Sequence, residues 1–227
     1  MIPRPANPLI AALDVSDLDR AKELAASLAP HVGMLKVGLE LFWAYGPDAA
    51  RIVANHAPVF VDAKLHDIPN TVERASANIA RLGAAMFSVH ALGGEAMMRA
   101  ALRGADRAAQ EAGRERPLVI AVTVLSSQSG EGLASPASLA FEAKAAGLDG
   151  VVVSGTDVED VRAACGEEFC LVVPGIRPAG LNGDDQVRVL TPRAAHEKGA
   201  DYLVVGRPIS GASDPVAAAL GILLGLR

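Results

Sequence analysis

The stretch FVDAKLHDIPNT, residues 60–71, ends an apolar run with two aspartates and a lysine. Side chains alternate along a β-strand, so VFVDAKL at 59–65 has an apolar face and a second face that carries Asp62 and Lys64. The apolar face suits a layer of helices, which leaves the two charges pointing into an enclosed space, with Asp67 just beyond. Because charge is costly to bury, the stretch predicts a strand that ends at a functional site.

Runs rich in Val, Ile and Leu recur along the 227 residues, and helix-like segments lie between them. In segments such as DLDRAKELAASLA, apolar residues return every three or four positions, as amphipathic helices require. About eight β/α units without a linker predict one (β/α)8 barrel domain, an α/β fold over 1–227, rather than an open doubly wound sheet. The expected strands are 9–15, 34–39, 59–65, 86–91, 118–125, 150–155, 170–176 and 202–208.

Composition excludes several classes of protein. Lys and Arg number 21 against 26 Asp and Glu, a net charge of −5, and basic residues form no runs, so we expect neither nucleic-acid nor membrane-surface binding. Two cysteines, Cys165 and Cys170, are too few for a disulfide framework or a metal site. With no secretory signal and no apolar run of membrane-spanning length, we expect a soluble cytoplasmic protein.

The same alternation places charges on neighbouring strands. Asp14 lies at the carboxyl end of the first expected strand and Lys36 lies within the second, and both are expected on the inward face beside Asp62 and Lys64. Such a set could be an ion-pair network that only plugs the barrel. Buried ion pairs are seldom a net source of stability, however, so four charges at the catalytic end of a barrel favour chemistry. The residues expected to face outward are Leu9, Ala11, Leu13, Val15, Leu35, Val37 and Leu39.

Two polar, glycine-bearing loops follow strand ends, at 126–135 and 177–186. Barrel enzymes place binding loops there, so both are candidate lids, although ordinary solvated loops would have the same composition.

The motif Asp62-x-Lys64-x-x-Asp67-Ile-Pro-Asn-Thr71 resembles that of the orotidine 5′-phosphate decarboxylase family. Other motifs extend the resemblance over nearly the whole chain: ALD (12–14), LKVG (35–38), VHALGG (89–94), IAVTVL (120–125), PGIRP (174–178), GDDQ (183–186) and VGRPI (205–209). Asp-x-Lys-x-x-Asp alone defines a wider group of phosphosugar-handling barrels. Members of that group that use Mg²⁺ carry a glutamate where this chain has Lys36, and a lysine repels a divalent cation, which favours the metal-free branch.

The resemblance implies decarboxylation of orotidine 5′-monophosphate to UMP and CO₂, the last step of pyrimidine nucleotide synthesis, without a cofactor or a metal. In this scheme Lys64 stabilises the developing carbanion and protonates it. Asp62 lies near the substrate carboxylate and orients Lys64. Asp14 and Lys36 hold ribose hydroxyls, and Lys36 completes the alternating network.

By the same resemblance, Asp67 and Thr71 reach into the neighbouring subunit's site, which makes the protein an obligate homodimer with two shared sites. Thr123, expected to face inward at the end of the fifth strand, contacts the pyrimidine. His66 and His90 are interpreted as supporting or packing residues, because Lys64 is the expected proton donor.

No Walker pattern occurs in the sequence, so other residues must bind the phosphate. Barrels often use the loops after strands seven and eight, which here contain Arg177, Gln186, Gly206 and Arg207. Arg207 offers bidentate donors and Gly206 a close backbone approach. The resemblance implies that Gln186 bridges phosphate and base, whereas Arg177 taken alone could be a surface arginine.

Two other functions stay open. One is a Mg²⁺-dependent sugar-phosphate decarboxylase or aldolase of the same barrel group, against which Lys36 argues. The other is a catalytically silent nucleotide-binding barrel, against which the intact set of Asp62, Lys64 and Asp67 argues.

Overall fold

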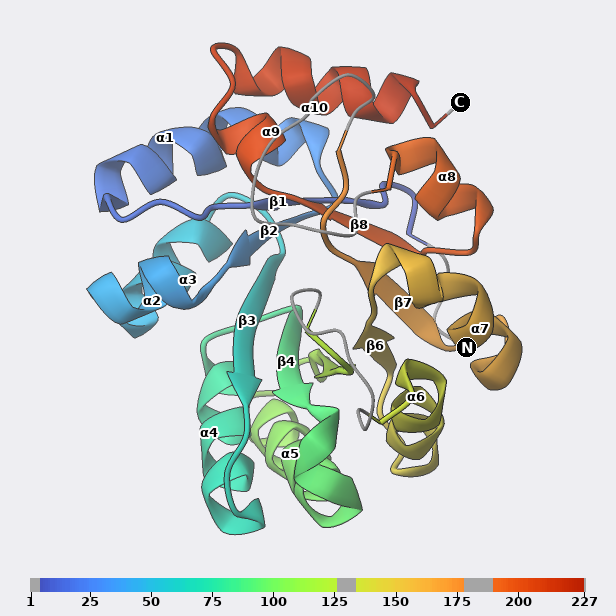
Figure 1. The fold of residues 1–227 in the computed structure, drawn as a ribbon. Helices are drawn as coiled ribbons and strands as arrows, with labels where there is room; N and C mark the ends of the chain where they lie inside the picture. Colours follow the sequence, from blue (N-terminus) through green and yellow to red (C-terminus); the bar gives the residue numbers. More distant parts are fainter. Residues whose placement is uncertain (1–4, 126–133, 178–189, 227) are drawn as a thin grey trace.

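The computed structural model describes residues 5–125, 134–177 and 190–226. Eight parallel strands follow one another around a closed barrel in which β8 pairs with β1. The strands are β1 (Leu9–Ala12), β2 (Met34–Val37), β3 (Val59–Leu65), β4 (Met86–His90), β5 (Leu118–Val122), β6 (Gly150–Val152), β7 (Cys170–Val173) and β8 (Tyr202–Val205). Helices surround the strands on the outside (Figure 1), so the predicted (β/α)8 barrel is confirmed.

The helices that cover the barrel begin where the sequence supplies caps and prolines. Asp17, Thr191 and Asp214 each accept a hydrogen bond from the backbone amide three residues on, as N-caps do. Within the described residues, no helix is long and apolar enough to cross a membrane. The helices are α1 (Leu18–Leu28), α2 (Leu39–Tyr45), α3 (Pro47–Ala54), α4 (Pro69–Arg81), α5 (Gly94–Glu111), α6 (Pro136–Ala145), α7 (Val158–Cys165), α8 (Pro192–Glu197), α9 (Arg207–Ser210) and α10 (Pro215–Leu224).

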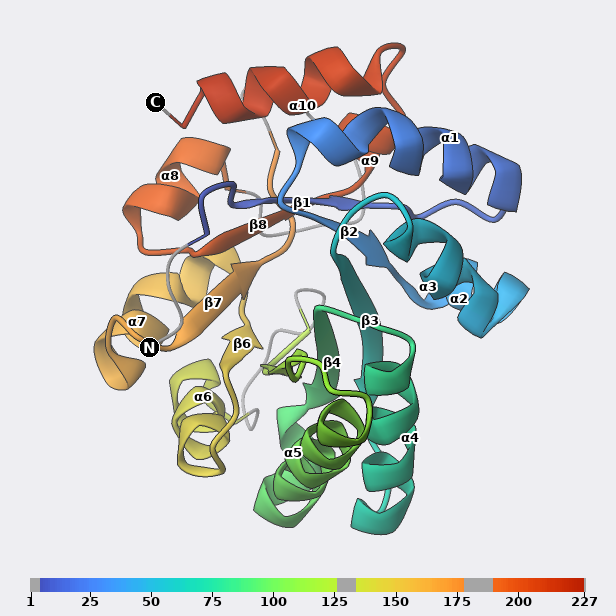
Figure 2. The ribbon, with the colours of Figure 1, turned by 180° about the vertical axis from the view of Figure 1, so that it is seen from behind.

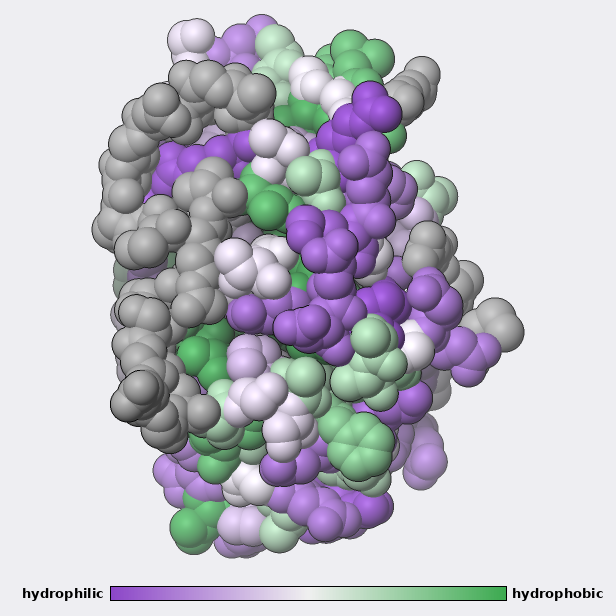
Figure 3. All heavy atoms as spheres, turned by 45° about the vertical axis from the view of Figure 1, so that its right-hand side comes forward, coloured by the Kyte–Doolittle hydropathy of each residue, from purple (hydrophilic) through white to green (hydrophobic). Residues whose placement is uncertain are grey.

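Two apolar layers result from the alternation along the strands. Ile10, Phe60 and Met86 pack with other inward side chains inside the barrel. Val59 and Val61 belong to the larger outer layer between the strands and the helices. Figure 2 shows from behind how the helices surround the strands. The predicted parity of the first three strands is therefore confirmed, and it brings Lys36, Asp62 and Lys64 to the inside. On the face drawn in Figure 3, hydrophilic residues predominate and hydrophobic ones form smaller groups.

An irregularity in β3 lies at the charged residues. Val61 pairs with Phe87 and Leu65 pairs with Val89, so four positions along β3 match two along β4. Because both numbers are even, the outward face of β3 stays outward across the bulge. Lys64 has a φ of 48°, the only positive value for a non-glycine residue in the described part of the chain.

Several strands end earlier than their apolar runs. The second run was expected to continue to Leu39 with that side chain outward. Instead β2 ends at Val37 and Leu39 begins α2, where it is 44% exposed. The chain turns into the helix at Gly38, which ends the ladder. β1 ends at Ala12, although the Leu13 amide still donates to the Lys36 carbonyl at 3.0 Å.

Candidate active site

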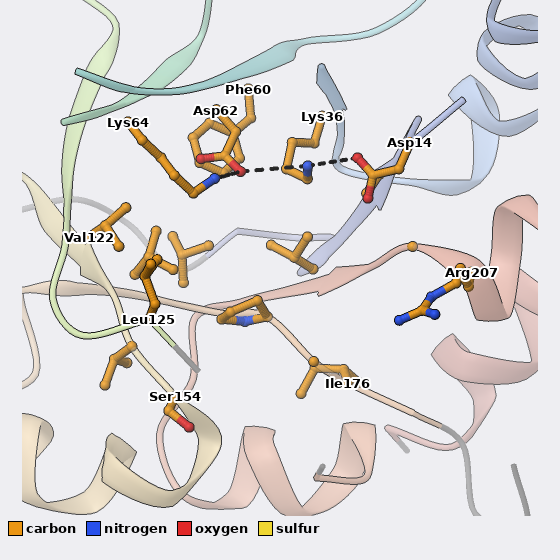
Figure 4. A pocket seen from close by; sticks show the side chains of 18 of the residues that line it. Asp14, Lys36, Phe60, Asp62, Lys64, Val122, Leu125, Ser154, Ile176 and Arg207 are labelled. Carbon is orange, nitrogen blue, oxygen red and sulfur yellow. Dashed lines mark hydrogen bonds and ion pairs between the residues drawn. The ribbon is translucent and has the colours of Figure 1, made fainter. Parts of the chain in front are cut away.

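A cavity of about 240 Å³ opens at the carboxyl ends of the strands. Asp14, Lys36, Asp62 and Lys64 line one side of it, and Figure 4 shows them as a continuous chain of ion pairs. The other walls are mainly apolar and come from later strands and loops: Val122, Val124, Leu125, Val152, Val153, Val172, Pro174, Ile176, Val204 and Pro208. The cavity therefore offers a charged wall opposite an apolar one.

Asp62 is the centre of the charged wall. Its Oδ2 atom lies 2.6 Å from Lys64 Nζ and 3.6 Å from Lys36 Nζ. Lys36 Nζ also donates to Asp14 Oδ1 at 3.1 Å. The order is thus Lys64, Asp62, Lys36, Asp14 with alternating sign, which confirms the alternation expected from the sequence.

The carboxylate of Asp62 is held in its charged form. Burial opposes ionisation, but the charges of Lys36 and Lys64, with hydrogen bonds from Lys64 and Ser88, outweigh it and lower the pKa of Asp62 below its ordinary value. Exposure falls from 42% for the side chain of Asp14 to 13% for Asp62 and 9% for Lys36. At neutral pH the wall therefore carries a fixed carboxylate between two lysines, with Lys64 more open to the cavity, at 31% exposure.

Ser88 belongs to this arrangement and was missed in the sequence. The fully buried side chain donates to Asp62 Oδ1 at 2.7 Å and accepts from the Lys64 amide at 2.9 Å. The available signal was a lone hydroxyl in the apolar run MFSVHA, two positions from the inward Met86.

Arg207 and Gly206, at the start of α9, line the cavity away from the lysines, and Figure 4 shows Arg207 apart from the ion-pair chain. A Cβ atom on Gly206 would lie 3.3 Å from Asp14 Oδ2, so glycine leaves room for that carboxylate. Arg177 lines the cavity as well, and its amide donates to the Leu190 carbonyl at 3.0 Å. The structure thus brings both arginines to one cavity.

Asp67 and Thr71 lie elsewhere. Both are exposed at the start of α4, and neither lines the cavity of its own chain. The Asp67 carboxylate accepts from the Ile68 amide at 2.6 Å. Asp67 and Ile68 instead border an open hollow with Leu92, and both apolar side chains are more than half exposed.

Thr123 is not where it was expected. Ile120 packs inside the barrel and Val122 lines the cavity, so Thr123, the residue directly after β5, falls on the other face. The Thr123 side chain is fully buried, and its hydroxyl donates to the Val152 carbonyl at 3.0 Å. Gln186 and most of both candidate lid loops lie outside the described residues.

Two histidines stack beside the charged wall. The rings of His66 and His90 lie 5.3 Å apart with planes 24° from parallel. Burial, with the nearby His66 and Lys64, lowers the pKa of His90. Neither histidine lines the cavity.

Among the described residues, no group of three or more His, Cys, Asp and Glu side chains could hold a metal ion. The two carboxylates of the wall, on Asp14 and Asp62, are separated by the Lys36 ammonium, which binds both. This donor set suits an anionic or hydroxyl-bearing ligand.

A closed barrel with a charged cavity at the carboxyl ends of its strands defines a (β/α)8-barrel enzyme. The chain belongs to the family described as orotidine 5′-phosphate decarboxylase / HUMPS, whose model matches residues 7–222.

Curated relatives and solved structures agree with this membership. The orotidine 5′-phosphate decarboxylase of Moorella thermoacetica is 48% identical over 94% of this chain and 90% of its own length. That of Anaeromyxobacter dehalogenans is 49% identical over 98% of this chain and 100% of its own. The crystal structure of the enzyme from Lactobacillus acidophilus has a TM-score of 0.84 and 37% identity, covering 97% of this chain and 99% of the other.

Proposed function

We propose that this chain decarboxylates orotidine 5′-monophosphate to UMP and CO₂ in the cytoplasm, as the last step of UMP synthesis, without a cofactor. The observation that carries the proposal is the Lys64, Asp62, Lys36 array on one wall of the cavity. Relatives that share about half of the residues are named for this reaction.

Lys64 is the proposed proton donor. In the reaction, the bond between a pyrimidine ring carbon and the carboxylate breaks, CO₂ leaves, and the electron pair stays on the ring carbon. Lys64 Nζ then gives that carbon a proton and becomes a neutral amine. Its 2.6 Å contact with Asp62 supports this role, because the carboxylate holds the ammonium in one place.

Lys64 alone does not supply the catalysis. An ammonium about 4 Å from a unit negative charge gains roughly 4 kcal/mol at an effective dielectric of 20. Enzymes lower barriers by about 8–23 kcal/mol. The remainder must come from prearranged charges in the cavity and from binding energy at parts of the substrate that do not react.

Binding away from the reacting carbon is assigned to the two other regions of the cavity. Asp14 and Lys36 are proposed to hold the ribose hydroxyls, for which one carboxylate and one ammonium provide an acceptor and donors. Arg207, with Arg177 and the close backbone of Gly206, is proposed to hold the phosphate. Gln186 is a proposed contact to the base, whereas Thr123 faces away from the cavity and is not assigned one.

We further propose a homodimer that shares its two sites. Asp67 and Thr71 are exposed and lie outside the cavity of their own chain, next to the exposed apolar side chains of Ile68 and Leu92. A second copy packed on this surface would bury the apolar pair and could carry Asp67 into its partner's cavity. This arrangement would explain why Asp67 belongs to the same sequence motif as Asp62 and Lys64 but does not line the cavity of its own chain.

The family description also covers HUMPS proteins, so the test must separate metal-free decarboxylation from a Mg²⁺-dependent reaction on a sugar phosphate. Purified protein is incubated with orotidine 5′-monophosphate, and its loss of absorbance is followed with and without EDTA. We expect turnover that EDTA leaves unchanged. Absence of turnover would reject the proposal, and abolition by EDTA would favour the metal-dependent enzyme.

A further inference from the structure

Ser88 joins the backbone and the side chain of the proposed proton donor. Its hydroxyl oxygen accepts from the Lys64 amide at 2.9 Å and its proton goes to Asp62 Oδ1 at 2.7 Å. The other carboxylate oxygen of Asp62 accepts from Lys64 Nζ at 2.6 Å. The bonds thus form a closed ring: Lys64 amide, Ser88 hydroxyl, Asp62 carboxylate, Lys64 ammonium.

The ring lies where the backbone is strained. Lys64 is the one non-glycine residue with a left-handed φ among the described residues, at the bulge between β3 and β4. Such a conformation costs on the order of 1–3 kcal/mol and persists only where the surroundings enforce it. The bulge lies between the paired residues Val61 and Leu65. Within it, the Lys64 amide is joined to β4 by its hydrogen bond to Ser88.

We propose that Ser88 is a positioning residue that fixes both the Asp62 carboxylate and the left-handed backbone of Lys64, so that the ammonium meets the reacting carbon. The inference rests on the roles proposed above for Asp62 and Lys64. Ser88 does not line the cavity, so it acts through these two residues and not on the substrate.

A second buried serine shows why the bonds matter. Ser76 on α4 is as fully buried as Ser88, but its hydroxyl has no hydrogen-bond partner among the described residues. Burial alone therefore does not explain the hydrogen bonds of Ser88, which joins the Asp62 carboxylate to the backbone amide of the strained residue Lys64. Ser76 also supplies a matched control, because Ser76→Ala removes a buried hydroxyl without touching the ring.

The experiment compares Ser88→Ala, Ser88→Thr and Ser76→Ala with the unaltered protein, measuring kcat, KM and the pH profile of kcat/KM for orotidine 5′-monophosphate. We expect Ser88→Ala to lower kcat about tenfold or more, since a hydrogen bond to a charged group is lost, and to leave KM within about twofold. Ser88→Thr keeps a hydroxyl and should recover most of kcat. Ser76→Ala should match the unaltered protein.

The pH profile gives a readout that a purely structural role would not move. Asp62 faces Lys36 from β2, Lys64 from its own strand and Ser88 from β4. Ser88 is one of the groups that lower the pKa of Asp62. Without the hydroxyl, the acid limb of kcat/KM in Ser88→Ala should move to higher pH, and in Ser88→Thr it should stay.

The inference is overturned if folded Ser88→Ala keeps kcat within about twofold, or if the Ala and Thr variants lose kcat equally with an unmoved acid limb. Folding is checked by thermal unfolding. If Ser88→Ala does not fold, Ser88→Cys replaces it with the same expected outcomes, because a thiol is of similar size and a weak hydrogen-bonding group. Absence of turnover by the unaltered protein would reject the proposed function instead.

Discussion

Charged side chains lie at both ends of the barrel, but they are bonded differently. At the amino end, Arg162 on α7 donates to three backbone carbonyls and, at 2.7 Å, to Asp201 Oδ2. Asp201 also accepts from the Leu171 amide at 2.8 Å. Arg116 and Asp149 repeat the pattern with bonds of 2.6 and 2.8 Å, and Asp149 accepts from a backbone amide of β5 at 2.7 Å.

At the carboxyl end, the lysines bond other side chains. Lys36 lies between Asp14 and Asp62, and Lys64 bonds Asp62, with all four side chains facing a cavity. A backbone partner joins a charged side chain to the strands and helices of the fold. A side-chain partner beside a cavity leaves donors for a ligand. The comparison assigns stability to the first kind of charge and chemistry to the second.

The largest expected effect tests the carboxyl end. Lys64→Ala should lower kcat by at least about a hundredfold, since it removes the proposed general acid. A UMP-like ligand should still raise the melting temperature, because Asp14, Lys36 and Arg207 remain in the cavity. Steady-state kinetics and thermal unfolding with and without the ligand measure both.

Lys144→Ala is the matched control for Lys64→Ala. Lys144 Nζ donates at 2.6 Å to the Cys165 carbonyl, so this lysine has the backbone kind of partner. Its loss should leave kcat unchanged. Turnover that survives in Lys64→Ala while ligand binding disappears would contradict the proton-donor role.

At the amino end, a substitution is expected to lower stability and leave kcat unchanged. Asp201→Ala leaves the buried Arg162 guanidinium without its carboxylate and the Leu171 amide without that acceptor. Breaking one partner of a buried ion pair typically costs about 3–5 kcal/mol. Urea unfolding should show a loss of this size, while kcat per folded molecule stays near that of the unaltered protein.

An exposed pair provides the control for Asp201→Ala. Glu197 on α8 binds Arg193 at 2.8 Å, with both side chains more than half exposed. Glu197→Ala should leave the unfolding curve in place, because solvent screens such pairs. If both variants unfold alike, the amino-end ion pairs do not hold the barrel as argued.

Asp67 tests whether a charge at the carboxyl end can act in another chain, because it lies outside the cavity of its own chain. If its place is in a partner's cavity, inactive Asp67→Ala and inactive Lys64→Ala proteins should restore activity when mixed. With free exchange, half of the dimers are hybrids with one intact site, so about a quarter of the sites recover. Activity after mixing, with exchange shown by mass-tagged subunits, checks this; no recovery despite exchange would exclude a shared site.

The sequence alone was enough to predict the barrel, from its eight β/α units, and the charged wall, from the alternation of side chains along the strands. Lys36, Asp62 and Lys64 were placed correctly inside even though β3 contains a bulge, since the bulge preserves the faces. Thr123 was placed on the wrong face, because Ile120 and Val122 are the inward residues of β5 and the next residue therefore faces outward. A strand that is buried on both faces is apolar throughout, so its sequence does not show which face is inward.

Contacts between distant segments were not predictable in this way. Ser88 is an ordinary small residue in an apolar run until β4 lies beside the bulge of β3. The partners Arg162 and Asp201 are 39 positions apart and neither belongs to a motif. Each depends on a register or a loop path that only the folded chain defines.

The smallest expected effect is a pH dependence of stability at the carboxyl end. The pKa of Asp62 is lower in the folded protein than its ordinary value of 3.8, so its ionised form stabilises the fold above that pH. This contribution is lost as the pH falls through the folded pKa. Asparagine cannot ionise, so the difference in unfolding free energy between the unaltered protein and Asp62→Asn should be constant near neutrality and shrink below about pH 4. Urea unfolding from pH 7 downward measures this difference, with Asp19→Asn on the exposed surface of α1 as the control. A difference that stays constant in acid would mean that Lys36 and Lys64 do not hold Asp62 ionised.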